Sequence, residues 1–140
     1  MKFFRFIISF LLFFLAQGQI FASEASDFNQ KGWTEYGFGI FESAHKYFLQ
    51  ASRIKSATPD EYCQAMTGLA FCIQFGSKGN ASASELEQAV SYYEKAIEKV
   101  GESSKYIPFL KSMIAECNFM IYEKNKDQAY LNKAEELWTD

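Results

Sequence analysis

Large apolar, small and aromatic residues recur along this chain in a fixed order and at a fixed spacing. The order is a large apolar residue, an alanine three positions later and an aromatic residue four positions after that. It occurs at Phe41, Ala44 and Phe48, at Leu86, Ala89 and Tyr93, and at Leu131, Ala134 and Trp138. Offsets of three and four place such residues on one face of a helix. Because the three alanines are each 45 positions apart, the pattern predicts a helical unit repeated three times.

The upstream halves of the second and third units also match each other at this spacing. The matched pairs are Leu69 and Ile114, Ala70 and Ala115, Cys72 and Cys117, and Phe75 and Met120. Each unit is therefore expected to hold two helices, of which the second carries the repeated alanine. The expected helices span about 27–38, 42–55, 58–76 and 82–101, and two more begin near 104 and 131.

Helix-capping residues support these boundaries. Thr58 can cap a helix, Pro59 suits the first helical position, and Glu61 can complete a capping box. Either Ser82 or Ser84 is expected to cap the next helix, since a glutamate follows each of them at the position that a capping box requires.

The first unit resembles the tetratricopeptide repeat family. The matching residues are Phe28, Gly32, Tyr36, Gly39, Phe41, Ala44, Phe48 and Ala51, and residues 91–97 are similar to the second helix of that family. The resemblance covers roughly 27–140 and implies an all-α fold, a right-handed superhelical stack of helix-turn-helix pairs in units of about 24–57, 58–102 and 103–140. That family repeats about every 34 residues, so the period here predicts a longer loop inside the second unit. Other helix-pair repeats also fit the pattern.

In the resembled family the first helix of each pair lines a concave groove that holds a partner segment. Carried over position by position, the candidate partner-binding residues are Asn29, Trp33, Tyr36, Thr67, Phe71, Gln74, Phe75, Ser112, Glu116 and Phe119. An aromatic groove with few lysines or arginines suits an apolar or mixed segment. The alternative for Trp33, Tyr36, Phe71 and Phe75 is a place in the core.

These features together favour a non-enzymatic protein–protein interaction module that binds a peptide or helix of a partner protein. The alternative is a structural subunit that associates with copies of itself through its last repeat. Solenoid ends normally need a polar cap, whereas Trp138 lies close to the end of the sequence. The partner itself cannot be named from the sequence.

The first 22 residues have the order of a secretory signal peptide. Lys2 and Arg5 give a basic start, an apolar stretch follows, and small residues come after it. Cleavage is expected after Ala22, with Gly18 and Ala25 as other sites. The apolar run is shorter than the 18 or more residues that indicate a membrane span. The chain is therefore expected to be exported, periplasmic or secreted, and the alternative is an uncleaved membrane anchor.

Charge argues against nucleic acid as a partner. The net charge is −3, and it becomes −5 without the first 22 residues, in which Lys2 and Arg5 are the only charged side chains. Phosphate contacts from lysine and arginine supply most of the affinity for nucleic acid. An acidic chain without a basic cluster does not meet that requirement.

No residue pattern predicts catalysis, a metal or a cofactor. His45 is the only histidine, has no nucleophile spaced to pair with it, and is expected on the solvated surface. The paired carboxylates at 60–61, 85 and 87, and 135–136 fall at helix starts or on polar faces. The segment 76–80 lacks the glycine–lysine order of a phosphate loop, and 80–82 is a glycosylation sequon.

The three cysteines are expected to be free thiols. Cys72 and Cys117 occupy equivalent positions in successive units. Packed helices lie about 8–10 Å apart, whereas a disulfide needs Cα atoms about 4.4–6.8 Å apart. Small buried apolar side chains are the expected role of these residues.

Overall fold

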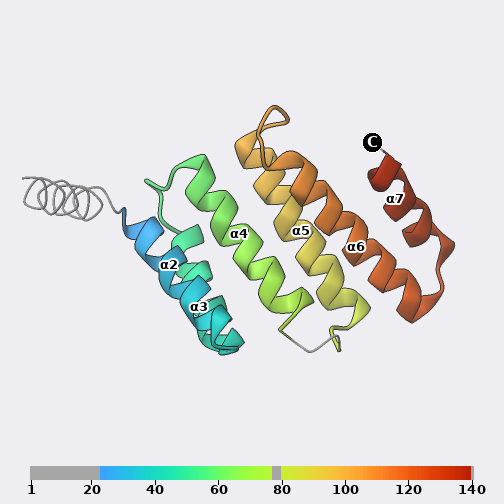
Figure 1. Cartoon of the computed structure of the whole chain (residues 1–140), viewed down its shortest axis with the longest axis horizontal. Helices are drawn as coiled ribbons and strands as arrows, with labels where there is room; N and C mark the ends of the chain where they lie inside the picture. The colour runs from blue at the N-terminus through green and yellow to red at the C-terminus, as the bar shows by residue number, and fades with distance from the viewer. Residues whose placement is uncertain (1–22, 77–79, 140) are drawn as a thin grey trace, which may run out of the picture.

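The computed structural model describes residues 23–76 and 80–139, and these are helical throughout apart from the connecting turns (Figure 1). The helices are α2 (Glu24–Gly37), α3 (Phe41–Ser52), α4 (Pro59–Gln74), α5 (Ala83–Val100), α6 (Ile107–Asn125) and α7 (Gln128–Thr139). No strand occurs within these residues, so the expected all-α class is confirmed. The expected signal peptide, at 1–22, lies outside the described residues, as does part of the 76–80 segment.

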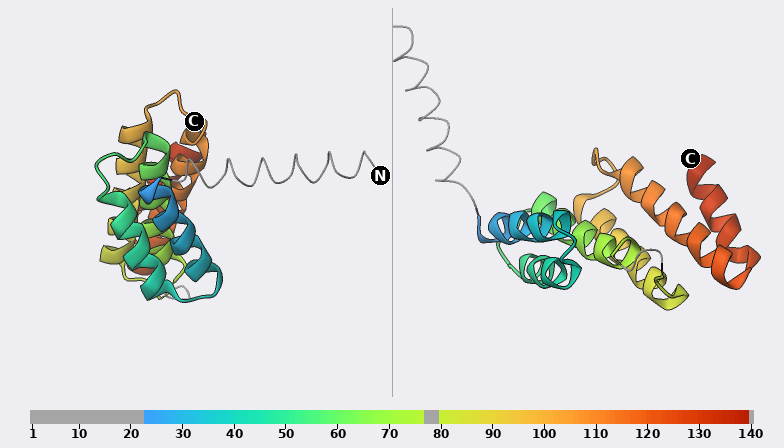
Figure 2. Two further views of the ribbon diagram at one scale, coloured as in Figure 1. Left: turned by 90° about the vertical axis from the view of Figure 1, so that its left-hand side faces the viewer. Right: turned by 60° about the horizontal axis from the view of Figure 1, so that its bottom comes forward.

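The helices form a row in which each one packs on the next along the chain. Contacts join α2 to α3, α3 to α4, α4 to α5, α5 to α6, and α6 to α7. In addition α4 packs on α2, so the first helices of the first two expected units are direct neighbours. The right-hand view of Figure 2 shows the same order, with α6 and α7 at the far end of the row from α2 and α3.

Two of the helix starts are the expected capping boxes. The Glu61 backbone N–H donates to Thr58 Oγ1 over 3.2 Å, and the Thr58 N–H donates to the Glu61 carboxylate over 2.8 Å. Ser82, rather than Ser84, caps α5, and it forms the same pair of bonds with Glu85. Both boxes satisfy backbone donors that have no partner inside the helix.

The first and last helices begin three residues earlier than expected. Ser23 caps α2, because its hydroxyl accepts a 3.0 Å hydrogen bond from the Ser26 N–H. The same hydroxyl donates to the Glu61 carboxylate, which ties the start of α2 to α4. At the other end, Asp127 Oδ1 accepts from the Ala129 N–H over 2.9 Å and starts α7 at Gln128.

The repeated alanines lie in the core, as the 45-residue pattern predicts. Ala44, Ala89 and Ala134 are fully buried, and so are the aromatic partners Phe48 and Tyr93. The third aromatic residue of the pattern differs: Trp138 is 51% exposed. Among the described residues no helix follows α7, so nothing covers this ring as α4 covers Phe48.

Phe48 is inserted between two glycines of different helices. A Cβ atom added to Gly32 on α2 would lie 2.6 Å from Phe48 Cε1, and one added to Gly68 on α4 would lie 2.5 Å from Phe48 Cδ1. Neither position leaves room for a larger residue at the present spacing. The Phe48 ring therefore packs directly against two backbones and sets how α2, α3 and α4 meet.

Candidate functional site

Five aromatic side chains form a continuous band over the first helices of the three pairs. They are Trp33 and Tyr36 on α2, Phe71 and Phe75 on α4, and Phe109 on α6. Phe71 lies at the centre: its ring centroid is 5.7 Å from that of Trp33, 6.0 Å from Tyr36, 5.1 Å from Phe75 and 6.1 Å from Phe109. We call these five residues the aromatic band.

The aromatic band is only partly covered by the rest of the molecule. Trp33, Tyr36 and Phe71 are partly buried, whereas Phe75 is 37% and Phe109 45% exposed. Helical spacing explains why neighbouring members meet, since Trp33 and Tyr36 are three residues apart and Phe71 and Phe75 four. Such ring pairs add about 0.5–1.5 kcal/mol beyond the burial of their area. The band is therefore a continuous, largely apolar surface that is partly exposed to solvent.

Three of the expected groove residues lie inside the molecule instead of on its surface. Asn29 and Gln74 are 1% exposed and Thr67 is 9% exposed. Asn29 Nδ2 donates to the Glu61 carbonyl over 2.8 Å, which joins α2 to α4. The expected surface placement is thus wrong for these three side chains. Packing of α4 on α2 covers Asn29, and α4 is itself packed against α2, α3 and α5, which leaves Thr67 and Gln74 inside the molecule.

Glu116 and Phe119 are on α6 and do not belong to the aromatic band. Glu116 is partly buried on α6, and Ser112, one turn before it, is exposed. Phe119 belongs to a second aromatic group at the end of the row, where its ring is 5.9 Å from Trp138 and 6.4 Å from Tyr122. The expected groove residues therefore divide into the band, a buried set and this C-terminal group.

Phe109 is the member of the band that sequence reasoning missed. The 45-residue register places Gln64 opposite it, so no repeated aromatic position pointed to it. A helical signal was present, however, since Phe109 and Glu116 are seven residues apart on one helix face. A large apolar residue in the first turn of α6, on the same face as an expected site residue, was the available indication.

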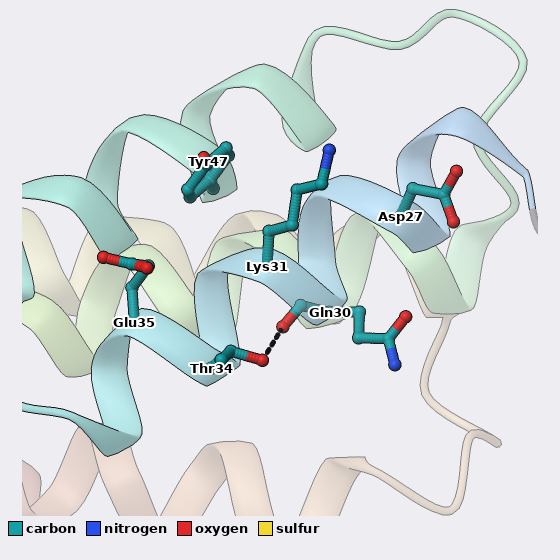
Figure 3. A pocket seen from close by; sticks show the side chains of 6 residues that line it. All are labelled: Asp27, Gln30, Lys31, Thr34, Glu35 and Tyr47. Atoms are coloured by element: carbon teal, nitrogen blue, oxygen red, sulfur yellow. Dashed lines mark hydrogen bonds between the residues drawn. The ribbon is translucent and has the colours of Figure 1, made fainter.

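A polar surface pocket of about 280 Å³ lies between α2 and α3 (Figure 3). It is lined by Asp27, Gln30, Lys31, Thr34, Glu35 and Tyr47. Lys31 projects from the opposite side of α2 to Trp33, because two positions are about 200° apart around a helix. The pocket is thus separate from the aromatic band, and none of the expected site residues lines it.

Glu61 and Glu85, which belong to the carboxylate groups expected at helix starts or on polar faces, act in capping boxes. Hydrogen bonds lower the pKa of Glu61. The largest effect comes from the Ser23 hydroxyl, and the next from the Thr58 backbone N–H. The Ser82 backbone and hydroxyl lower the pKa of Glu85. Both carboxyl groups therefore remain ionised acceptors of helix-end donors at neutral pH.

The histidine and the three thiols are all at least partly buried. His45 is partly buried instead of fully solvated as expected, and this burial lowers its pKa. Cys63, Cys72 and Cys117 are free and buried, in agreement with the expectation. Burial raises the pKa of both Cys72 and Cys117 to about 12. At neutral pH these thiols are protonated, which disfavours nucleophilic chemistry.

No group of three or more metal-ligating side chains occurs in 23–76 and 80–139. Of the helices in these two ranges, none combines the length and the apolar character that crossing a bilayer requires.

Comparison with known protein families, with curated proteins and with solved structures finds no match for this chain. The functional interpretation therefore depends on the geometry of the helices and the aromatic band.

Proposed function

We propose that this chain is a non-enzymatic interaction module that holds a segment of a partner protein on its aromatic band. The observation that carries this proposal is the half-exposed ring cluster around Phe71. Exposed aromatic side chains on a stiff scaffold are typical of binding surfaces, because they bury a large area with little loss of side-chain freedom. The band extends over α2, α4 and α6. Each of these helices is held in place by its packing on neighbouring helices.

The proposed arrangement is the right-handed superhelical stack of tetratricopeptide-like pairs. Its support is the packing of first helix on first helix, seen between α2 and α4 and in the contact between Phe71 on α4 and Phe109 on α6. Stacked pairs of this kind give an extended surface made from the first helices. The aromatic band lies on those helices.

We also propose export, with cleavage after Ala22. The support is the basic start and apolar stretch of the first 22 residues. Ser23 caps α2, and Ala25 is fully buried. Cleavage after Ala25 would remove both residues, which favours Ala22. The mass of the protein recovered from an exporting host tests this, and an intact Met1 would contradict it.

Self-association through the last helix has less support. The exposed residues of α7 are mostly polar: Gln128, Ala129, Asn132, Lys133, Glu135, Glu136, Trp138 and Thr139. A polar outer face is what the end of a helical stack needs for solubility. Light scattering at high protein concentration distinguishes self-association from partner binding on the aromatic band. Self-association through α7 requires a dimer, and the Trp138→Ala variant should form that dimer more weakly.

Peptide selection tests the binding proposal without a known partner. A random 12-residue peptide library displayed on phage is selected against the protein made from the full chain. Selected peptides should bind the Phe75→Ala/Phe109→Ala variant at least about tenfold more weakly. Phe38→Ala is the matched control, because Phe38 is 76% exposed and lies in the turn after α2. Unchanged binding by the band variant would overturn the proposal.

A further inference from the structure

The position of Glu116 places a carboxylate beside the aromatic band. Phe109, Ser112 and Glu116 follow one face of α6, since they are spaced by three and four residues. Phe109 contacts Phe71, and Met120, one turn beyond Glu116, lies 3.9 Å from Gln74 Nε2. Glu116 therefore lies between two points at which α6 meets α4.

This carboxylate has no partner among the described residues. No hydrogen bond or ion pair to Glu116 occurs within 23–76 and 80–139, although the side chain is partly buried. Its negative charge contributes to the raised pKa of Tyr93, after burial and the Cys117 thiol. A partly buried carboxylate that no cation of the described residues pairs with is free to accept a charge-assisted hydrogen bond from another molecule.

No lysine or arginine of α2, α4 or α6, the first helices of the three pairs, is directed toward Glu116. Helix α4 contains no lysine or arginine. Lys31 lies over the rings of Phe28 and Tyr47, at 5.8 and 6.0 Å, on the other side of α2, as Figure 3 shows for Tyr47.

The two lysines of α6 also lie off the helix face that carries Phe109, Ser112 and Glu116. Lys124 is close enough to Glu85, at the start of α5, to lower the pKa of that carboxyl, as a lesser cause after Ser82. Lys111 is five positions from Glu116, about 140° around the helix. In contrast Glu123 lies on the same face as Glu116, seven residues later, and is exposed.

We propose that the aromatic band and Glu116 together bind a peptide segment in which an arginine or lysine is flanked by apolar residues. This inference rests on the proposed function and specifies its partner. The apolar side chains pack on Phe71, Phe75 and Phe109, and the cation pairs with the Glu116 carboxylate. A cation is also attracted to the face of an aromatic ring, and the attraction grows as water is excluded. An acidic segment would meet repulsion from Glu116 and Glu123.

The phage selection described above tests this through the sequences it recovers. Selected peptides should be enriched in arginine or lysine next to apolar residues. Glu116→Gln should weaken their binding about tenfold, because it removes a charge-assisted interaction. Glu94→Gln, at an exposed position of α5, is the matched control and should change nothing. Melting temperature measured by circular dichroism shows whether each variant is folded.

Charge reversal provides a second measurement that does not depend on loss of binding. Selection against Glu116→Lys should recover peptides enriched in aspartate or glutamate instead. Two outcomes would show that the inference is wrong: selected peptides that carry no excess of arginine or lysine, or unchanged binding of these peptides by Glu116→Gln. If Phe109→Ala abolishes binding in either case, the proposed function still stands. If the selected peptides bind the Phe75→Ala/Phe109→Ala variant unchanged, both proposals fail.

Discussion

The Tyr93 hydroxyl donates a hydrogen bond of 2.8 Å to the side-chain oxygen of Gln74 in the middle of the core. Both side chains are fully buried. The bond joins α5 to α4, and the amide nitrogen of Gln74 reaches Met120 on α6, so that three helices meet at one glutamine. Because a buried amide needs partners for its oxygen and its nitrogen, Gln74 holds α4 and α5 together through Tyr93 and links this pair to the third one through Met120.

Tyr93→Phe should lower the free energy of unfolding by about 1–3 kcal/mol, because it leaves the Gln74 oxygen buried without a donor. The measurement is urea denaturation followed by circular dichroism. Tyr92→Phe is the control: its hydroxyl accepts only a long, exposed bond of 3.5 Å from Gln88, so a change within about 0.5 kcal/mol is expected. Equal effects of the two variants would contradict the role given to Gln74.

Gly68→Ala should destabilise the protein by about 1–3 kcal/mol, because the added methyl group collides with the Phe48 ring. This loss outweighs the gain of up to about 1 kcal/mol that alanine brings to a helix. Gly37→Ala, where an added Cβ meets no atom within 4 Å, should be neutral or stabilising. Chemical denaturation compares the two, and a stabilised Gly68→Ala variant would show that Phe48 can move aside.

Trp33→Ala and Phe109→Ala should affect stability differently although both residues belong to the aromatic band. The Trp33 ring lies 4.8 Å from the fully buried Phe48 ring, so its removal should cost about 2–4 kcal/mol. Phe109 is 45% exposed. Its replacement by alanine should lower the free energy of unfolding by about 1 kcal/mol or less. Thermal melting checks this, and it identifies Phe109 and not Trp33 as the residue to change when binding is measured.

Stability should fall as the pH rises above about 9. Burial raises the pKa of Cys72 and Cys117 from 9.0 to about 12. Between these values the unfolded thiols lose protons while the folded ones keep them. Each thiol then removes up to about 1.4 kcal/mol per pH unit. Urea denaturation at pH 8 and pH 10 measures the loss. A Cys72→Ala/Cys117→Ala variant should show a smaller decrease, and an equal decrease would refute this origin.

The sequence was sufficient for the helices and for most of the core. Apolar periodicity reports burial, and the alanines at 44, 89 and 134 are buried as predicted. Capping boxes are local interactions, so the starts of α4 and α5 could also be predicted. The start of α2 was missed, because Ser23 acts through a capping bond and a contact with Glu61, 38 positions away.

The candidate site was harder to predict, because exposure depends on which helices cover a residue. Trp33, Tyr36, Phe71 and Phe75 were expected together and lie together. Asn29, Thr67 and Gln74 were expected on the surface and are buried. The register of the resembled family placed these residues on the groove face, but neighbouring helices supply partners for Asn29 and Gln74 inside the molecule. Phe109 lies outside the repeat register, and only packing of α6 on α4 brings it to Phe71.

The two junctions between helix pairs differ in kind, and this difference has a mechanical consequence. At the first junction the Phe48 ring fits between Gly32 and Gly68, a close apolar contact that must be pulled apart over its whole surface. At the second, the amide nitrogen of Gln74 on α4 reaches Met120 on α6 while its oxygen accepts from Tyr93, and α7 beyond it contributes one buried residue, Ala134. In a linear stack each pair is supported only by its neighbours. Under a stretching force the chain should therefore unravel from its carboxyl end, so that α2, α3 and α4 remain folded as the last unit to yield.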